Sequence, residues 1–282
     1  MLVGGQSARM GTPKAALEWH GSTLLRRTVG IVARATGGPV VVVRAPGQEL
    51  PVLPKGILVV DDPREGKGPV QGIAAGLAAL RGRADIAFVS ATDMPFLHPA
   101  FIRRVLRVLG DNESADVALP VARGFSQPLA AAYRVSLADT AERLVQGDRL
   151  RPAFLFDTCT VDQLDDNALK EDPVLAALDP DLDSMVNVNT PADYRAALAR
   201  PAAEVTVQLL GSLARNGEQS GSRAVRAATV GAAAAALGLM LDWHVAATLN
   251  GDQIAADGET PLVAGDIVFF LPAQAGEASP NA

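Results

Sequence analysis

The chain has 282 residues with 25 Lys and Arg against 31 Asp and Glu, and this net charge of −6 argues against a general nucleic-acid binder, which usually carries a basic surface. A hydrophobic content of 49% and a charged content of 20% are typical of a globular protein large enough for one large and one small domain. The single cysteine, Cys159, excludes an intramolecular disulfide, and the absence of a signal-peptide pattern or a long apolar stretch predicts a cytoplasmic protein with no membrane partner.

The first 200 residues alternate short β-branched runs with longer helical patterns. Strands are expected over 40–43, 56–60, 86–89 and 117–120, and helices over 23–35, 70–81, 98–109 and 137–146. A further helix is expected from Thr190, a capping residue followed by Pro191, to about residue 199. The alternation predicts an α/β domain, Rossmann-like, with a mostly parallel sheet covered by helices on both faces.

A linker over 200–203 separates a second, smaller domain, expected over 204–275. Strand patterns over 204–210, 244–249 and 266–271 surround an Ala-rich helix over 229–239. Asn250-Gly251 is a strong hairpin signal after the second of these strands. The order predicts a small α+β domain of the β-grasp type, followed by a polar tail over 277–282.

A glycine-rich loop over 4–14 follows the start of the first strand and carries two cations, Arg9 and Lys14. Glycines let backbone N–H groups approach a phosphate closely, and the cations would neutralise its charge. The loop lacks the Gly-Lys-Ser/Thr spacing of a P-loop. A plain glycine turn beside surface cations is the alternative interpretation.

A second glycine-rich stretch, over 68–76, follows a strand that ends at Asp61-Asp62. Gly68 and Pro69 open a helix, whose free N–H groups face outward and suit an anionic ligand. An ordinary loop before a proline-initiated helix explains the same residues equally well.

Two polar sites are candidates for binding a metal. Asp93 comes directly after the strand over 86–89, at the carboxyl edge of the sheet, where α/β proteins bind ligands and where an oxygen ligand suits Mg²⁺. Asn187 and Asn189, two residues apart, would share one face of an extended segment. Helix capping by Asp93 and simple turn formation by the two amides are the alternatives.

In this order, the motifs resemble the molybdenum cofactor guanylyltransferase family over about residues 1–200. The likeness is carried by the residues 2–5, 7, 9–11, 14, 68–72, 93–95, 127–129, 133–134 and 187–191.

The resemblance implies that molybdopterin phosphate attacks the α-phosphorus of GTP and that pyrophosphate leaves. It implies catalytic roles for Arg9, Lys14 and Asp93, and a Mg²⁺ ion held by Asp93 and Asn189. Guanine rather than cytosine is favoured by Gly4-Gly5 and the stretch over 68–72. The nucleotide-binding residues that it implies are Leu2, Gly4, Gly5, Ser7, Gly11, Lys14, Asp62, Gly68, Pro69 and Asp93.

Residues 204–272 resemble the ubiquitin-like sulfur carriers of molybdopterin and thiamin synthesis. Those carriers end in Gly-Gly, whereas here Ala275-Gly276 is followed by six further residues. We therefore expect a docking or regulatory module, with molybdopterin-synthesis or molybdoenzyme-maturation proteins as partners.

Two other functions remain open from the sequence: a cytidylyltransferase for the same cofactor, and a non-catalytic scaffold that binds the cofactor. The family's first strand begins about five residues earlier relative to its glycine loop than Met1 does here. That strand is normally central, so either the true start lies upstream or ladder groups of the sheet stay unpaired, and the second alternative favours the scaffold. The presence of Arg9, Lys14 and Asp93 favours the enzyme.

Overall fold

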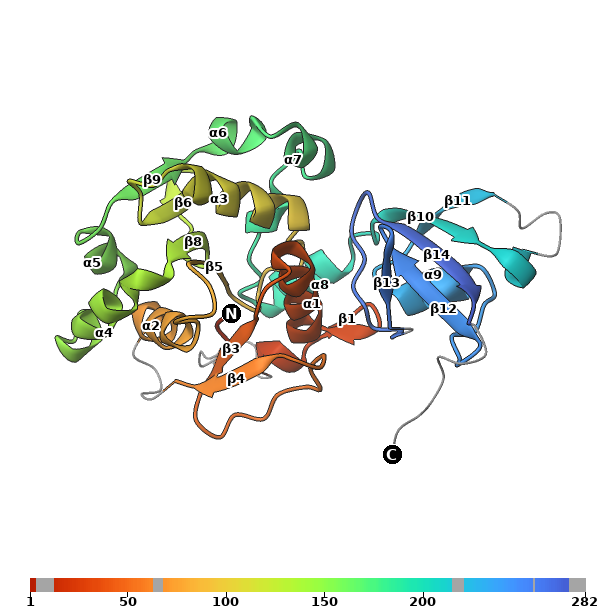
Figure 1. The fold of residues 1–282 in the computed structure, drawn as a ribbon, viewed down its shortest axis with the longest axis horizontal. Coiled ribbons are helices and arrows are strands. Elements are labelled where there is room, and N and C mark those ends of the chain that lie inside the picture. The colour runs from red at the N-terminus through yellow and green to blue at the C-terminus, as the bar shows by residue number, and fades with distance from the viewer. Residues whose placement is uncertain (4–12, 63–67, 215–220, 256, 274–282) are drawn as a thin grey trace. The chain divides into compact units, whose positions relative to one another are not determined.

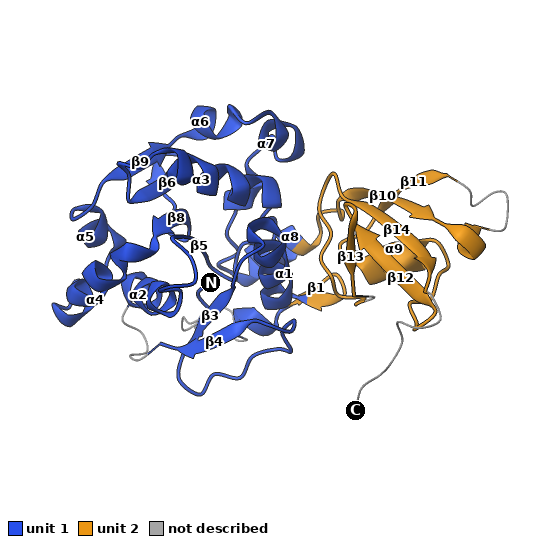
Figure 2. Cartoon of the chain, viewed as in Figure 1, with its two compact units in different colours: residues 1–17, 23–197 blue, residues 18–22, 198–282 orange. Residues whose placement is uncertain are grey.

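The structure is a computed structural model, which describes residues 1–3, 13–62, 68–214, 221–255 and 257–273 (Figure 1). The chain forms two compact units, coloured separately in Figure 2. Unit 1 comprises residues 1–17 and 23–197, and unit 2 comprises residues 18–22 and 198–282. The strands β1 (Glu18–Trp19) and β2 (Ser22–Thr23) form a two-stranded sheet. They include the short stretch, residues 18–22, at which the sequence of unit 1 is interrupted by residues of unit 2.

Unit 1 alternates strands and helices along its first 122 residues and becomes more helical after them. Its strands are β3 (Val41–Arg44), β4 (Leu58–Asp61), β5 (Ile86–Ser90), β6 (Val117–Ala122), β7 (Phe125–Ser126), β8 (Ala130–Arg134) and β9 (Val161–Leu164). Its α-helices are α1 (Leu24–Thr36), α2 (Pro69–Ala79), α3 (Pro99–Asp111), α4 (Ala138–Gln146), α5 (Pro152–Phe156), α6 (Asp166–Lys170), α7 (Pro173–Leu178) and α8 (Pro191–Leu198). Short 3₁₀ turns are η1 (Lys14–Ala16), η2 (Val135–Leu137) and η3 (Asp183–Met185).

The strands of unit 1 form mixed sheets rather than the mostly parallel sheet that the alternation predicts. β3 pairs with β4 in parallel, and β6 pairs with β9 in parallel. β8, however, lies antiparallel between β5 and β6. The physical reason is the short connection from β6 to β8, which is long enough for a hairpin but not for the helical crossover that parallel neighbours require.

Residues 1–3 connect the β3–β4 pair to the larger sheet. Leu2 forms parallel bridges with Val43 of β3 on one side and with Ala91, just after β5, on the other. The nitrogen of Val3 donates to Val43 O at 2.9 Å, and the nitrogen of Leu2 donates to Ser90 O at 2.8 Å. These three residues therefore occupy a central strand position between β3 and β5.

Local sequence signals explain where the main helices begin and end. Thr23 caps α1, because its side chain accepts a hydrogen bond from the nitrogen of Arg26, and Gly37 ends the helix in the left-handed conformation. Proline occupies the first turn of both α2 and α3. The apolar faces of these helices pack on the sheets around fully buried residues that include Leu24, Ile73, Phe101 and Tyr133.

In its described residues, unit 2 has a five-stranded sheet and one α-helix. Its elements are β10 (Glu204–Leu209), η4 (Gly211–Ala214), β11 (Ser222–Arg226), α9 (Val230–Ala236), β12 (Val245–Leu249), β13 (Asp252–Ile254) and β14 (Ile267–Pro272). The sheet order is β11-β10-β14-β12-β13, and β10 and β14 are its parallel pair. Asn250 and Gly251 form the turn between β12 and β13, as their sequence predicts. Unit 2 has its own hydrophobic core, which includes Val207, Val230 and Phe270.

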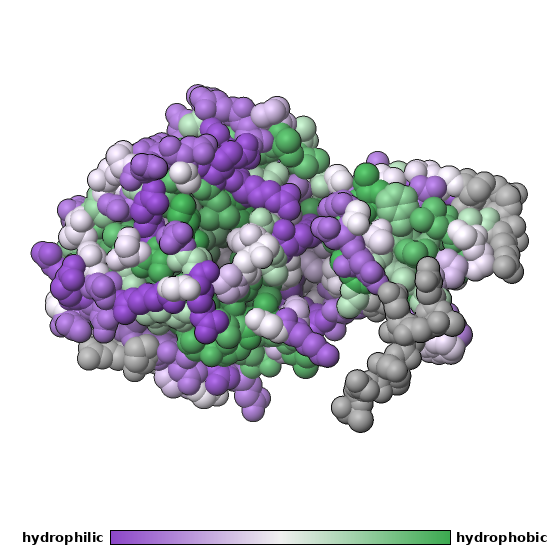
Figure 3. All heavy atoms as spheres, viewed as in Figure 1, coloured by the Kyte–Doolittle hydropathy of each residue, from purple (hydrophilic) through white to green (hydrophobic). Residues whose placement is uncertain are grey.

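The surface of unit 1 is mixed in character. Hydrophilic residues cover much of the face seen in Figure 3, with hydrophobic residues between them, as is usual for globular proteins. Within the part of the chain that the structure describes, no helix is both long and apolar enough to span a membrane.

Candidate functional site

Three polar side chains from distant parts of unit 1 meet at one point. The Lys14 ammonium lies 2.8 Å from Asp93 Oδ2 and donates a second hydrogen bond, of 3.0 Å, to Asn189 Oδ1. The side chains of Lys14 and Asp93 are each about one-fifth exposed, so the ion pair is partly shielded from water. The carboxylate and the amide oxygen thus converge on one cation at the edge of the sheet.

Asp93 is placed by the strand that precedes it. β5 ends at Ser90, and the chain turns over residues 92–93, so the carboxylate lies just beyond the carboxyl end of a buried strand. Its backbone oxygen accepts a hydrogen bond of 2.9 Å from the nitrogen of Val188. Because Val188 is buried, this bond anchors the segment that brings Asn189 to Lys14.

Asp193, in the first turn of α8, holds the backbone next to Asn189. Its Oδ2 accepts hydrogen bonds from the nitrogens of Asn189 at 3.2 Å and Thr190 at 2.9 Å, and its own nitrogen donates to Thr190 Oγ1 at 3.1 Å. The hydrogen bonds with the Thr190 side chain and with both backbone nitrogens, together with the nearby Lys14 charge, lower the pKa of Asp193. A charged carboxylate is therefore favoured at this position.

The start of α2 forms a second polar region. Gly68 caps the helix with a φ of 87°, and a Cβ at this position would lie 3.1 Å from Leu150 O, so glycine is required for both conformation and space. The Gln71 side-chain amide donates to Asp62 Oδ1. Gln71 is almost fully buried, and its Oε1 has no hydrogen-bond partner among the residues that the structure describes.

The structure places the residues predicted from sequence in three groups. Lys14, Asp93 and Asn189 come together, whereas Gly68, Pro69 and Asp62 belong to the region at the start of α2. Leu2 lies in the sheet, and its side chain packs against Gly72, where a Cβ would be 2.9 Å from Leu2 Cδ2. The other residues predicted to bind the nucleotide or to act in catalysis lie outside the described residues: Gly4, Gly5, Ser7, Arg9 and Gly11.

Sequence reasoning missed two residues of these regions, Asp193 and Gln71. Asp193 has a sequence signal, because an acid three residues after a capping Thr is typical of a reciprocal N-terminal cap. No comparable signal exists for Gln71, since its role depends on burial beside Asp62.

The donor set at Asp93 suits a hard divalent cation shared with a phosphate ligand. Among the described residues, no group of three His, Cys, Asp or Glu side chains could enclose a metal by itself. Asp93 and Asn189 offer two oxygens that already face a common cation, the Lys14 ammonium. Mg²⁺ typically takes one or two protein oxygens and completes its shell with water and phosphate oxygens. The residues therefore fit a magnesium–nucleotide complex.

Comparison with known proteins places the chain in a family. Residues 1–161 match the model of the MobA-like NTP transferase domain. A protein of Mycobacterium avium, named as a probable molybdenum cofactor guanylyltransferase, is 38% identical over 199 residues, which cover 70% of this chain and 92% of the relative. A Mycobacterium tuberculosis protein of the same name is 39% identical over 160 residues, or 56% of this chain and 77% of the relative.

A solved structure supports the fold. The molybdopterin-guanine dinucleotide biosynthesis protein A of Archaeoglobus fulgidus aligns with a TM-score of 0.54 and 24% identity, over 70% of this chain and 94% of that one. The matched family model covers more than half of the chain, and the Mycobacterium avium relative is covered almost completely. The chain therefore belongs to the MobA-like NTP transferase family and is a nucleotidyltransferase of the molybdenum cofactor guanylyltransferase type.

Proposed function

We propose that the chain transfers GMP from GTP to the terminal phosphate of molybdopterin and releases pyrophosphate. The observation that carries the proposal is the convergence of Lys14, Asp93 and Asn189 at the carboxyl edge of the sheet. The names of the relatives support the choice of guanine and of the molybdenum cofactor as the acceptor.

In the proposed reaction, an oxygen of the molybdopterin phosphate forms a bond to the α-phosphorus of GTP, and the bond from that phosphorus to the bridging oxygen of pyrophosphate breaks. Such a reaction needs positioning and charge neutralisation more than covalent help from the protein. A magnesium ion, held by Asp93 and Asn189, would supply a Lewis acid for the phosphates. Lys14 would then direct its ammonium to the phosphate oxygens, with Arg9 in the same role.

We place the nucleotide between this cluster and the start of α2. Helix α2 begins at Gly68 and Pro69 without a side-chain cap, so backbone N–H groups of its first turn have no partner within the helix. Such groups favour a polar or anionic ligand. The buried Oε1 of Gln71 offers a hydrogen-bond acceptor to the donor edge of guanine. Asp62 holds the Gln71 amide in place from the other side.

Titration of the intact chain with GTP, CTP and ATP, with and without Mg²⁺, tests the nucleotide choice, and pyrophosphate release with molybdopterin tests transfer. Asp93→Asn and Lys14→Met should each lower turnover by about 100-fold or more. Asp139→Asn is a matched control, because Asp139 forms an exposed ion pair with Arg81 away from the cluster. If the Asp93→Asn variant turned over as fast as the unchanged protein, the proposed role of this carboxylate would be refuted.

The nucleotide results also separate the alternatives. Magnesium-dependent binding of GTP alone supports guanylyl transfer, and a preference for CTP would instead identify a cytidylyltransferase. If the folded protein bound none of the three nucleotides, the non-catalytic scaffold would replace the enzyme.

For unit 2 we propose a ubiquitin-like β-grasp module that docks proteins of the same cofactor pathway. Its support is the five-stranded sheet, with one parallel pair, that packs with the helix α9 in the described part of the unit. Trp243 and Met240 are largely exposed and offer apolar contacts. Trp243→Ser should leave transfer to free molybdopterin unchanged but slow transfer when a molybdopterin-synthesis protein presents the cofactor. Equal rates in both assays would contradict docking through Trp243.

A further inference from the structure

The hairpin that joins β6 to β7 holds an aromatic ring in water. The two strands pair Ala122 with Phe125, so Arg123 and Gly124 alone form the loop. Both loop residues have a positive φ, of 51° and 80°, as in the type I′ turns of two-residue hairpins. Phe125 is 75% exposed, and among the large apolar side chains that are exposed in the described part of unit 1 it is the aromatic one. Because an exposed ring gains little from the hydrophobic effect, it stays available to a ligand.

Hydrogen bonds from the residues that follow fix this hairpin. The Gln127 nitrogen donates to Pro120 O at 2.8 Å, and the Gln127 side-chain amide donates to Phe125 O at 3.1 Å. The hydroxyl of Tyr133, a fully buried side chain, donates to Pro128 O at 2.8 Å. Gln127 and Pro128, which belong to a motif that carries the family resemblance, thus hold the backbone at Phe125. A ring on a fixed backbone loses little conformational freedom when a ligand stacks on it.

The hairpin lies at the same edge of the sheet as Asp93. β5 and β6 are both antiparallel to β8, so they run in the same direction and end at the same edge (Figure 1). Asp93 follows the end of β5 at Ser90, and Phe125 follows the end of β6 at Ala122. One strand, β8, separates β5 from β6, so two strand spacings, or roughly 10 Å, lie between them.

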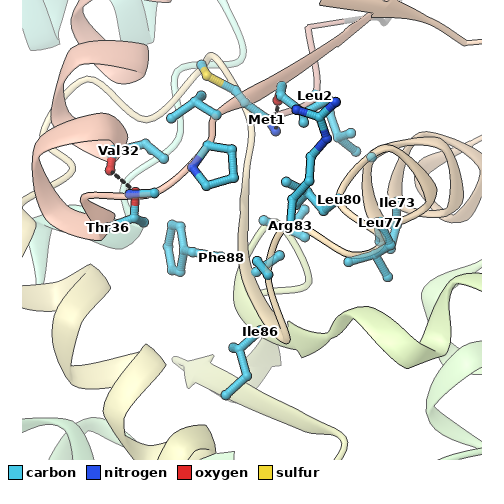
Figure 4. Close-up of a pocket in the computed structure, with 18 of the residues that line it drawn as sticks. Met1, Leu2, Val32, Thr36, Ile73, Leu77, Leu80, Arg83, Ile86 and Phe88 are labelled. Carbon is cyan, nitrogen blue, oxygen red and sulfur yellow. Dashed lines mark hydrogen bonds between the residues drawn. The ribbon is translucent and has the colours of Figure 1, made fainter. Parts of the chain in front are cut away.

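A cavity inside unit 1, of about 230 Å³, lies toward the other ends of the strands (Figure 4). Val41 at the start of β3 and Ile86 at the start of β5 line it, together with residues that precede both strands. Asp93, in contrast, follows the carboxyl end of β5. A ligand with its phosphate at Asp93 therefore extends along the carboxyl edge, where the hairpin lies, and not into this cavity.

We propose that Phe125 stacks on the pterin ring of the acceptor while the phosphate of the acceptor lies at the cluster of Lys14, Asp93 and Asn189. This inference rests on the proposed function, because it takes molybdopterin as the acceptor. Molybdopterin has a phosphate at one end and a flat heteroaromatic ring at the other, so it can extend from the end of β5 to the end of β6. Flat heteroaromatic rings stack on aromatic side chains.

This arrangement gives each substrate its own side of Asp93. Residues 1–3 and β3 lie beside β5 on one side, and α2, where we place the nucleotide, follows β4 beyond them. β8 and β6 lie on the other side, where Phe125 would bind the acceptor. The two substrates then meet at the cluster without competing for the same side chains. Phe125 is accordingly a residue that determines the affinity for the acceptor and not for the nucleotide.

The test uses the full chain and three substitutions. Phe125→Ser removes the ring, and Phe125→Trp keeps a flat ring. Val174→Ser is the matched control, because Val174 is also exposed but belongs to α7, which packs against α3 and α6. Molybdopterin is titrated into each protein under anaerobic conditions without GTP, and kcat and the KM for each substrate are measured in the transfer assay.

Phe125→Ser should raise the Kd and the KM for molybdopterin about tenfold, as expected for the loss of one ring stack, with kcat and the KM for GTP unchanged. Phe125→Trp and Val174→Ser should both keep the Kd of the unchanged chain. An unchanged Kd in Phe125→Ser would overturn the proposal, and so would an equal loss of affinity in Phe125→Ser and Phe125→Trp. If Phe125→Ser changed the sedimentation of the chain but not its Kd, the ring would be a contact between copies, and the proposal would be wrong.

The binding measurement contains no GTP, so it does not depend on transfer. A chain that binds molybdopterin through Phe125 but releases no pyrophosphate would contradict the proposed function and support this inference. A chain that transfers GMP with the same KM for molybdopterin after Phe125→Ser would support the proposed function and overturn this inference.

Discussion

The amino group of Met1 makes the stability of the chain depend on pH. In the folded protein its pKa is about 5, and in the unfolded chain it returns to 8.0. The unfolded state therefore takes up a proton below pH 8, while the folded state resists protonation until about pH 5. Stability should be greatest above pH 8, fall as the pH drops from 8 to 5, and level off below that.

The size of the effect follows from the pKa difference. Each pKa unit corresponds to about 1.4 kcal/mol, so the full effect is about 4 kcal/mol, and about 2.5 kcal/mol of it falls between pH 8.5 and pH 6. Acetylation of Met1 removes the charge but keeps an N–H that can donate to Val41 O. The acetylated chain should therefore lack this part of the pH dependence.

Urea unfolding of the free and acetylated proteins at pH 6, 7 and 8.5 measures the difference. The two proteins differ only at the Met1 nitrogen, so the comparison isolates the contribution of this group. If both proteins lost the same stability between pH 8.5 and pH 6, the amino group would not be buried as the structure shows, and the reasoning would be refuted.

Three further predictions concern positions that are defined by short contacts. Asp193→Ala should weaken the apparent affinity for Mg²⁺ in the transfer assay by roughly tenfold, with little change in kcat at saturating metal, because it releases the backbone at Asn189; an effect on kcat alone would contradict this role. Gly231→Ala should destabilise unit 2 by about 1–3 kcal/mol in calorimetry, since its Cβ would lie 2.8 Å from Gly258 O, whereas Gly110→Ala, which meets open space, serves as the control. Asp172→Ala should cost about 1–2 kcal/mol at pH 7, through loss of the cap of α7. Burial alone would raise the pKa of Asp172, but its hydrogen bonds lower it, so this cost should shrink as the pH falls below 4.

The long helices and the buried strands could be predicted from the sequence, because each has a local cause. Helices α1 and α3 combine an apolar face with a capping residue, and the strands β3 and β5 are short apolar runs. β8 was missed, since Ala130 to Ala132 have a weak intrinsic preference for strands. Their strand conformation depends on burial between β5 and β6, which only the fold provides.

Of the candidate site, too, only one part could be predicted from the sequence. The position of Asp93 was predictable, because residues that follow a buried strand gather at one edge of a sheet. The sequence indicated that Asn189 was a metal candidate but not that its amide would contact Lys14, which is 175 residues away. That contact depends on the hydrogen bond from the nitrogen of Val188 to the backbone oxygen of Asp93, and no local sequence pattern predicts this bond.

This bond between Val188 and Asp93 has a consequence for synthesis of the protein on the ribosome. Lys14 and Asp93 emerge early, but the amide that completes their cluster, Asn189, belongs to the last segment of unit 1. Domains generally fold as units during synthesis, with the amino-terminal one first. A nascent chain can therefore build most of the sheet while the cluster that we propose to bind the metal is still incomplete. Release of residues 188–193 from the ribosome, rather than collapse of the core, would then set the moment at which the chain can first hold a magnesium–nucleotide complex.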